Sequence, residues 1–279
     1  MGWKELRITA NSGISVVSGF VTGKGAAVAL ELGMVISVRE WKDPENDRNV
    51  QRLLEIMKER YGGNNEFSVR VLKRLPSSQG LKSSSAIVGG ILMAYAEMNG
   101  IELSQEEMLR DGSEISRETK MSATGATDDL AISLLGGLCI ANNYEGKLIK
   151  RQIIEEKPVI ILTTNRKKES FKFGSNDFSF LNRAYEDMWN RVNRYNFEYT
   201  AIINGNYMGT ISQSKLDYEK LQNLNFSYAG VNGKGPSVFL IYRNTADRSK
   251  DASILKAKGI KFISTRLSNR PAYVERIKA

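Results

Sequence analysis

The feature that most constrains this chain is a serine-rich loop, 76–86, between a strand-like segment and an apolar helix-like one. Apolar and polar residues alternate over 67–72, which predicts a strand, whereas the apolar run 87–98 predicts a helix that ends at Asn99-Gly100. Gly80 permits a sharp turn, and serines are good helix caps. The N–H groups and positive dipole end at such a helix start favour an anion, most naturally a phosphate. A serine-rich surface loop that only caps the helix is the alternative.

Composition excludes several kinds of chemistry. The chain has 279 residues, 41% hydrophobic and 25% charged, which is typical of a globular protein of one or two domains. It contains no histidine, so a Ser-His pair and a histidine-ligated zinc site are excluded. Its single cysteine, Cys139, rules out a disulfide framework and is predicted to be buried in a strand.

The chain shows no sign of a membrane or export signal. No N-terminal segment has the form of a signal peptide, and the longest nearly uncharged run, 86–96, is too short to span a bilayer. We therefore expect a cytoplasmic protein with no membrane partner. The net charge of +9 suggests nucleic-acid binding as an alternative of a different class, but the basic residues are spread among 31 acids. The sequence leaves open whether the protein is a monomer or a homodimer.

The order of predicted elements indicates two units with a boundary near residue 155, giving 1–155 and 156–279. The first forty residues are β-rich, with strand-like runs at 6–9, 14–18, 26–30 and 34–41 separated by glycines. Further strands are predicted at 67–72, 138–142, 159–162, 237–242, 261–265 and 273–277. Helices are predicted at 49–61, 87–98, 104–119, 178–195, 198–208, 216–224 and 246–258, with another that stops at Gly136-Gly137. The helix at 104–119 opens with Ser104-x-x-Glu107, which has the form of a capping box.

Acidic residues provide the candidate chemistry. Asp128 and Asp129 lie in a loop rich in glycine and threonine, where a carboxylate near a nucleotide could accept a hydroxyl proton. An aspartate that caps the following helix is the alternative for one of them. Glu118 has the hard oxygen that Mg²⁺ prefers, although it is equally suited to a solvated helix surface.

Neither a Gly-x4-Gly-Lys-Ser/Thr loop nor a Gly-x-Gly-x-x-Gly fingerprint is present, so a nucleotide would need another phosphate loop. The loop 76–86 is the obvious one. A second glycine-rich turn, 230–236, could also wrap backbone N–H groups around phosphate.

Four segments together resemble the GHMP kinases, the family of galactokinase, homoserine kinase and mevalonate kinase. The loop Pro76-x3-Gly80-Leu81-x-Ser83-Ser84-Ser85-Ala86 is similar to the phosphate-loop motif of that family. The segments 22–30, 124–137 and 229–237 agree in order and spacing with its archaeal-type shikimate kinase branch. The resemblance extends from about residue 10 to 245.

The resemblance implies an α+β GHMP kinase fold. Its N-terminal part would be a ribosomal-protein-S5-like α/β domain, and its C-terminal part a ferredoxin-like α/β sandwich. The implied activity is that of a shikimate kinase, with ATP and Mg²⁺, which phosphorylates the 3-hydroxyl of shikimate on the way to chorismate and the aromatic amino acids. Another small-molecule substrate of the family, homoserine or mevalonate, is the alternative.

The resemblance also implies roles for individual residues. Asp129, seven residues before Gly136, matches the catalytic aspartate, with Asp128 as second choice, and Ser85 and Glu118 match Mg²⁺ ligands. The implied phosphate-binding residues are Pro76, Ser77, Ser78, Gln79, Gly80, Leu81, Lys82, Ser83, Ser84, Ser85 and Ala86, together with Gly233, Lys234 and Gly235.

Two departures from the family pattern concern charge. The third motif usually reads Ser-Gly-Thr-Gly-Pro, whereas this chain has Asn232-Gly233-Lys234-Gly235-Pro236. The early Ala-Pro-Gly-Lys lysine of some relatives has no counterpart among residues 10–14. Lys24, Lys82 or Lys234 would have to compensate the charge of the phosphates.

Overall fold

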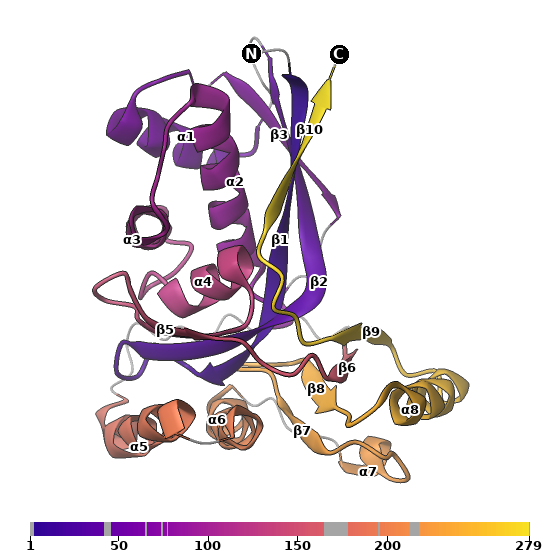
Figure 1. Cartoon of the computed structure of the whole chain (residues 1–279). Coiled ribbons are helices and arrows are strands. Elements are labelled where there is room, and N and C mark those ends of the chain that lie inside the picture. The colour runs from indigo at the N-terminus through magenta and orange to yellow at the C-terminus, as the bar shows by residue number, and fades with distance from the viewer. Residues whose placement is uncertain are drawn as a thin grey trace.

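Two antiparallel sheets form the framework of the computed structural model (Figure 1). The structure describes residues 3–41, 46–64, 66–73, 75–76, 78–164, 178–194, 196–212 and 218–278. Among the predicted site residues, Ser77 lies outside this description.

The first sheet is built on one long hairpin. Its strand order is β10-β1-β2-β4-β5, and β3 pairs with β2 as well. The strands are β1 (Trp3–Val17), β2 (Lys24–Glu40), β3 (Phe67–Lys73), β4 (Leu138–Asn142), β5 (Lys147–Gln152) and β10 (Tyr273–Lys278). Residues 35–40 of β2 pair with β3 and residues 24–28 with β4, so these two strands share one edge of the hairpin.

Helices cover one side of this sheet (Figure 1). They are α1 (Arg48–Tyr61), α2 (Ser83–Asn99), α3 (Gln105–Glu118) and α4 (Thr127–Leu135). The central α2 is apolar on nearly every side because it packs on the hairpin as well as on the other three helices. The capping box predicted at Ser104 and Glu107 is confirmed at the start of α3. Cys139 is buried in β4, as predicted.

The four short strands predicted in the first forty residues are wrong in number, because the structure has two long ones, β1 and β2. The glycines of this region suggest turns, yet Gly13 lies within β1. A Cβ atom on Gly13 would stand 2.1 Å from Ile132 Cδ1 and 2.5 Å from the carbonyl oxygen of Val28. The glycine is there because α4 packs closely on the hairpin, and not because the chain turns.

The second sheet has the order β7-β8-β6-β9. Its strands are β6 (Pro158–Leu162), β7 (Tyr228–Val231), β8 (Val238–Ile241) and β9 (Phe262–Arg266). The described helices of this part are η2 (Ser179–Leu181), α5 (Asn182–Arg194), α6 (Phe197–Ile211), α7 (Tyr218–Leu221) and α8 (Thr245–Ala257). Helices α5 and α6 also pack against the lower end of the β1–β2 hairpin in Figure 1, which joins the two parts.

Three features of the C-terminal half were not predicted. Strands β5 and β7 were not predicted. Of the helix expected at 216–224, residues 216–217 lie outside the described part of the chain, and the described residues form the short α7. Strand β10 returns to the first sheet and pairs with β1, so the end of the chain forms part of that sheet. The division near residue 155 stays a prediction. No helix in the described ranges is long and apolar enough to cross a membrane.

Candidate active site

The start of α2 is not capped by the side chain of its N-cap residue. Lys82, at the N-cap position, has a left-handed backbone (φ 64°, ψ 28°) and makes no side-chain hydrogen bond to the helix. The prediction that serines cap this helix is wrong, because Ser83, Ser84 and Ser85 already form its first turn. The backbone N–H groups of that turn have no partner within the helix and point out of its start. They could therefore bind an anion.

The two predicted phosphate loops lie against each other. A Cβ atom on Gly80 would stand 2.6 Å from the carbonyl oxygen of Asn232 and 3.5 Å from that of Gly235. The Ser237 hydroxyl donates a hydrogen bond to the carbonyl oxygen of Gln79. Gly80 has φ +77°, so it combines a left-handed backbone with a contact that leaves no room for a side chain.

Asn232 attaches the second loop to β1. Its Oδ1 accepts from the backbone N–H of Ser15 at 3.0 Å, and its Nδ2 donates to the carbonyl oxygen of Gly13 at 3.2 Å. The side chain is fully buried. In the sequence, Asn232 is only a departure from the family motif. In the structure, it positions the glycine-rich turn 230–236 against β1.

Lys82 and Asp129 meet between the starts of α2 and α4. Lys82 Nζ lies 3.0 Å from Asp129 Oδ1 and also donates to the Ser15 hydroxyl. The side chains are only 12% and 18% exposed. Asp129 Oδ1 has no aligned hydrogen bond within the described part of the chain, so its contact with Lys82 is an ion pair. A buried carboxylate oxygen with unused acceptor capacity can receive a hydroxyl proton.

Asp128 contacts different elements from Asp129. Its carboxylate is buried, accepts a hydrogen bond from Asn143 Nδ2 at 2.8 Å, and lies against the backbone of Gly25. Burial, and then the negative charge of Asp129, raise the pKa of Asp128 to about 7, although Lys82 opposes the shift. Neither aspartate is the N-cap of α4, because that position is Ala126 with a left-handed backbone.

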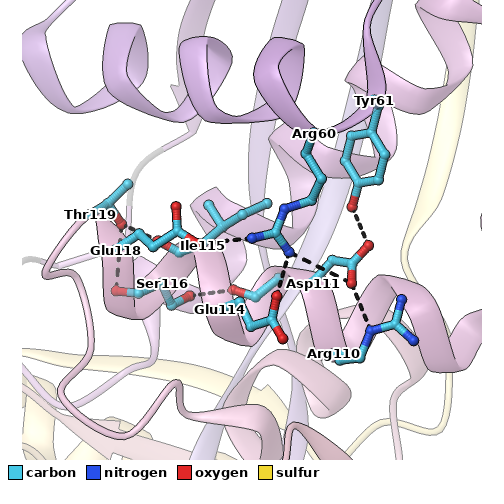
Figure 2. Close-up of polar contacts among 10 residues, drawn as sticks. Arg60, Tyr61, Arg110, Asp111, Glu114, Ile115, Ser116, Glu118 and Thr119 are labelled. Atoms are coloured by element: carbon cyan, nitrogen blue, oxygen red, sulfur yellow. Dashed lines mark hydrogen bonds and ion pairs between the residues drawn. The ribbon is translucent and has the colours of Figure 1, made fainter.

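Glu118 is held by an arginine from another helix. Figure 2 shows Arg60 of α1 reaching the carboxylates of α3: its Nη2 lies 2.8 Å from Glu118 Oε1, and its Nη1 lies 2.6 Å from Glu114 Oε2. Nη1 is also 3.7 Å from Asp111, which accepts a hydrogen bond from Tyr61. The Glu118 side chain is 45% exposed.

The three candidate lysines have different surroundings. Lys24 Nζ contacts both carboxylate oxygens of Glu186, at 2.7 and 2.9 Å. Lys234 Nζ lies 4.9 Å from the centre of the Phe20 ring, a cation–π geometry. Of the three, Lys82 is the one that the structure places beside an aspartate of the predicted site.

Comparison with known proteins decides the family. A model of the GHMP kinases N terminal domain matches residues 48–137. The shikimate kinase of Thermoplasma acidophilum is 30% identical over 250 residues, which cover 88% of each chain. That of Pyrococcus furiosus is 31% identical over 247 residues, 83% of this chain and 89% of that one. This chain belongs to the GHMP kinases.

The GHMP kinase fold extends over both parts of the chain. The crystal structure of Methanococcus jannaschii mevalonate kinase matches with a TM-score of 0.66 and 17% identity, covering 94% of this chain and 98% of that one. The predicted family and its α+β fold are thereby confirmed. The nucleic-acid-binding alternative keeps only the net charge in its favour.

The residues at the start of α2 fit the ATP that GHMP kinases use. The side chain of the N-cap residue Lys82 does not cap the helix, and Gly80 lies against the second loop where only glycine fits. For Mg²⁺, the hydroxyl of Ser85, which is 6% exposed, and the carboxylate of Glu118 are oxygen donors of the right type. The described residues contain no group of three or more metal-binding side chains. Protein sites commonly hold Mg²⁺ through one or two side chains plus phosphates.

Proposed function

We propose that this GHMP kinase is a shikimate kinase, which transfers the γ-phosphate of ATP to the 3-hydroxyl of shikimate and forms shikimate 3-phosphate. The observation that carries the proposal is the similarity to shikimate kinases, at 30 and 31% identity over more than four fifths of the chain. The reaction is a step toward chorismate and the aromatic amino acids. We place the enzyme in the cytoplasm and give it no membrane or nucleic-acid partner.

In this proposal the two contacting loops hold the triphosphate. The loop 76–86 includes the first turn of α2, which would supply N–H groups from Ser83 onward, and Gly233, Lys234 and Gly235 would supply those of the second loop. Gly80, Lys82 and Gly233, where the two loops meet, have left-handed backbones. Such residues turn the chain so that successive N–H groups can point toward one anion, which supports this use. The positive end of the α2 dipole adds to the attraction of phosphate.

Asp129 is the proposed proton acceptor. As the substrate hydroxyl oxygen forms a bond to the γ-phosphorus, its proton passes to Asp129, and the bond from the γ-phosphorus to the bridging oxygen breaks to release ADP. The ammonium of Lys82 lies 3.0 Å from Asp129. It would stabilise the negative charge that develops near Asp129 during phosphoryl transfer. Bound Mg²⁺, with Ser85 and Glu118 as proposed ligands, would neutralise charge on the phosphate oxygens.

The test is an ADP-release assay with Mg-ATP and a panel of alcohols: shikimate, homoserine, mevalonate and galactose. We expect turnover with shikimate to be far faster than with the others. The variant Asp129→Asn serves as a control, because it should remove acceptor-dependent ADP release and so expose any contaminating kinase. Comparable turnover on homoserine or mevalonate, with none on shikimate, would refute the proposed substrate and leave the family assignment intact.

A further inference from the structure

Asn143, directly after β4, uses all of its polar groups to join other elements. Its backbone N–H donates to the carbonyl oxygen of Gly23 at 2.7 Å, and its own carbonyl oxygen accepts from Arg117 Nη1 of α3 at 3.1 Å. Its side-chain Oδ1 accepts from the backbone N–H of Asp128 at 3.0 Å, and its Nδ2 donates to Asp128 Oδ1 at 2.8 Å. The residue is 1% exposed and connects the β1–β2 turn, α3 and the first turn of α4.

The two side-chain contacts with Asp128 need a group that accepts and donates at once. An amide does both. An alanine at 143 would leave a helix-start N–H and a buried carboxylate oxygen without these partners. An aspartate at 143 would still accept from the N–H, but it would bring a second carboxylate against that of Asp128.

Close packing keeps the pair in this arrangement. A Cβ atom on Gly25 would stand 2.5 Å from Asp128 Oδ2 and 2.8 Å from Asn143 Nδ2, and one on Gly19 would stand 2.1 Å from Asn143 Nδ2. Backbone without side chains therefore covers both polar groups. Neither side chain has room to move toward the β1–β2 hairpin.

The direction of Asp128 decides the direction of Asp129. Consecutive residues of an α-helix point about 100° apart around its axis, because one turn takes about 3.6 residues. With Asp128 held inward by Asn143, Asp129 points toward the start of α2, where its Oδ1 is 3.0 Å from Lys82 Nζ. Rotation of α4 by a fraction of a turn would break this ion pair.

We propose that Asn143 is a positioning residue for phosphoryl transfer, which fixes the first turn of α4 so that Asp129 faces Lys82 and the substrate hydroxyl. This inference rests on the proposed function, in which Asp129 accepts the proton. It gives Asp128 a structural part as the partner of Asn143. If Asp128 were instead the proton acceptor, Asn143 would act on the reacting carboxylate itself, and the experiment below separates the two.

The experiment exchanges the two side chains. Four variants are compared with the wild-type enzyme: Asn143→Ala, Asn143→Asp, Asp128→Asn, and the double variant Asn143→Asp with Asp128→Asn. In the double variant the carboxylate at 143 accepts from the backbone N–H of residue 128 and from its new amide, so both contacts are restored. Each is assayed for kcat, for KM of ATP, and for hydrogen exchange of the backbone amides of residues 124–130.

We expect Asn143→Ala and Asn143→Asp to lower kcat about tenfold or more, because small misplacement of a reacting group is costly, with KM for ATP changed less than about twofold. Amide exchange over 124–130 should become faster in both. The double variant should recover kcat to within about threefold of the wild type and recover slow exchange. Tyr61→Phe is the control: it removes a partly buried hydrogen bond between α1 and α3, to Asp111, and should leave kcat unchanged.

Three results would overturn the proposal. One is a normal kcat in Asn143→Ala. Another is a double variant that stays as slow as Asn143→Asp, which would mean that a carboxylate is required at position 128. The third is unchanged amide exchange in the single variants. The value of kcat is measured with whichever alcohol of the panel the wild type phosphorylates. Hydrogen exchange of the backbone amides is measured without any alcohol substrate. Failure with shikimate would therefore refute the substrate and still leave the role of Asn143 decided.

Discussion

Lys82 Nζ and Asp129 Oδ1 lie 3.0 Å apart, each next to the start of a different helix. The N-cap residues of α2 and α4, Lys82 and Ala126, both have left-handed backbones and make no side-chain hydrogen bond to their helices. Two helix starts, each with a partial positive charge, therefore converge on one carboxylate and one ammonium. This arrangement couples the phosphate loop to the candidate proton acceptor, and the predictions below test its parts.

The two aspartates should differ in effect. Asp129→Asn keeps the shape but removes the proton acceptor, so kcat should fall about 10²- to 10⁴-fold while ATP binding changes little. Asp128→Asn should cost less, because an amide can still accept from Asn143 Nδ2. Steady-state kinetics of both variants decide the matter. If Asp128→Asn were the more damaging, the assignment of the acceptor would have to be reversed.

Ser85→Ala should raise the Mg²⁺ concentration needed for half-maximal rate and lower turnover, with a small change in Tm. Removal of a true capping serine would cost about 0.5–2 kcal/mol of stability, but Ser85 lies inside the first turn of α2 and not at its N-cap. Mg²⁺ titration of the rate and thermal unfolding are measured together. A lower Tm with a normal Mg²⁺ requirement would make Ser85 a structural residue.

Glu118 and Glu114 form a matched pair, because Arg60 contacts both at 2.8 and 2.6 Å. We expect Glu118→Gln to raise the Mg²⁺ requirement and Glu114→Gln to leave it unchanged, since only Glu118 is a proposed ligand. Loss of either exposed ion pair should change stability by no more than about 1 kcal/mol. Equal Mg²⁺ curves for the two variants would restrict Glu118 to the contact between α1 and α3.

Lys234→Thr should change KM for ATP less than about threefold at low salt. Its ammonium lies over the Phe20 ring, at 4.9 Å from the ring centre. We therefore expect this contact to stabilise the conformation of the loop around Lys234. A loss of about 0.5–1 kcal/mol in stability is expected, and it should be smaller when Phe20 is already leucine. A tenfold rise in KM for ATP that shrinks as salt is added would instead show that the ammonium reaches the phosphates.

Stability should depend on pH through Asp128. Burial and the charge of Asp129 raise its pKa to about 7, so the folded protein holds this proton more tightly than the unfolded chain does. The stabilising contribution is complete below the ordinary carboxyl pKa of about 4 and is lost as the pH rises to about 7. The Tm of the wild type should therefore fall relative to that of Asp128→Asn between about pH 4 and pH 7. A constant difference in Tm would refute the raised pKa.

The sequence by itself determined the features that depend on neighbours along the chain. The serine loop before an apolar run placed the start of α2 within a few residues, and the capping box at Ser104 placed α3, because caps and periodicity are local. The spacing of the motifs also identified the family. The same local rules failed at Gly13, since a glycine required by close packing looks like a glycine required by a turn.

Only the tertiary structure decided how those local features act together. Asp128 and Asp129 are adjacent and chemically identical, and their different environments come from β2 and Asn143 on one side and Lys82 on the other. Asn143 carries no sequence signal, because its role consists of contacts with residues far away in the chain. Packing sets which partners each carboxylate meets, and those partners set which carboxylate oxygen keeps acceptor capacity for a substrate proton.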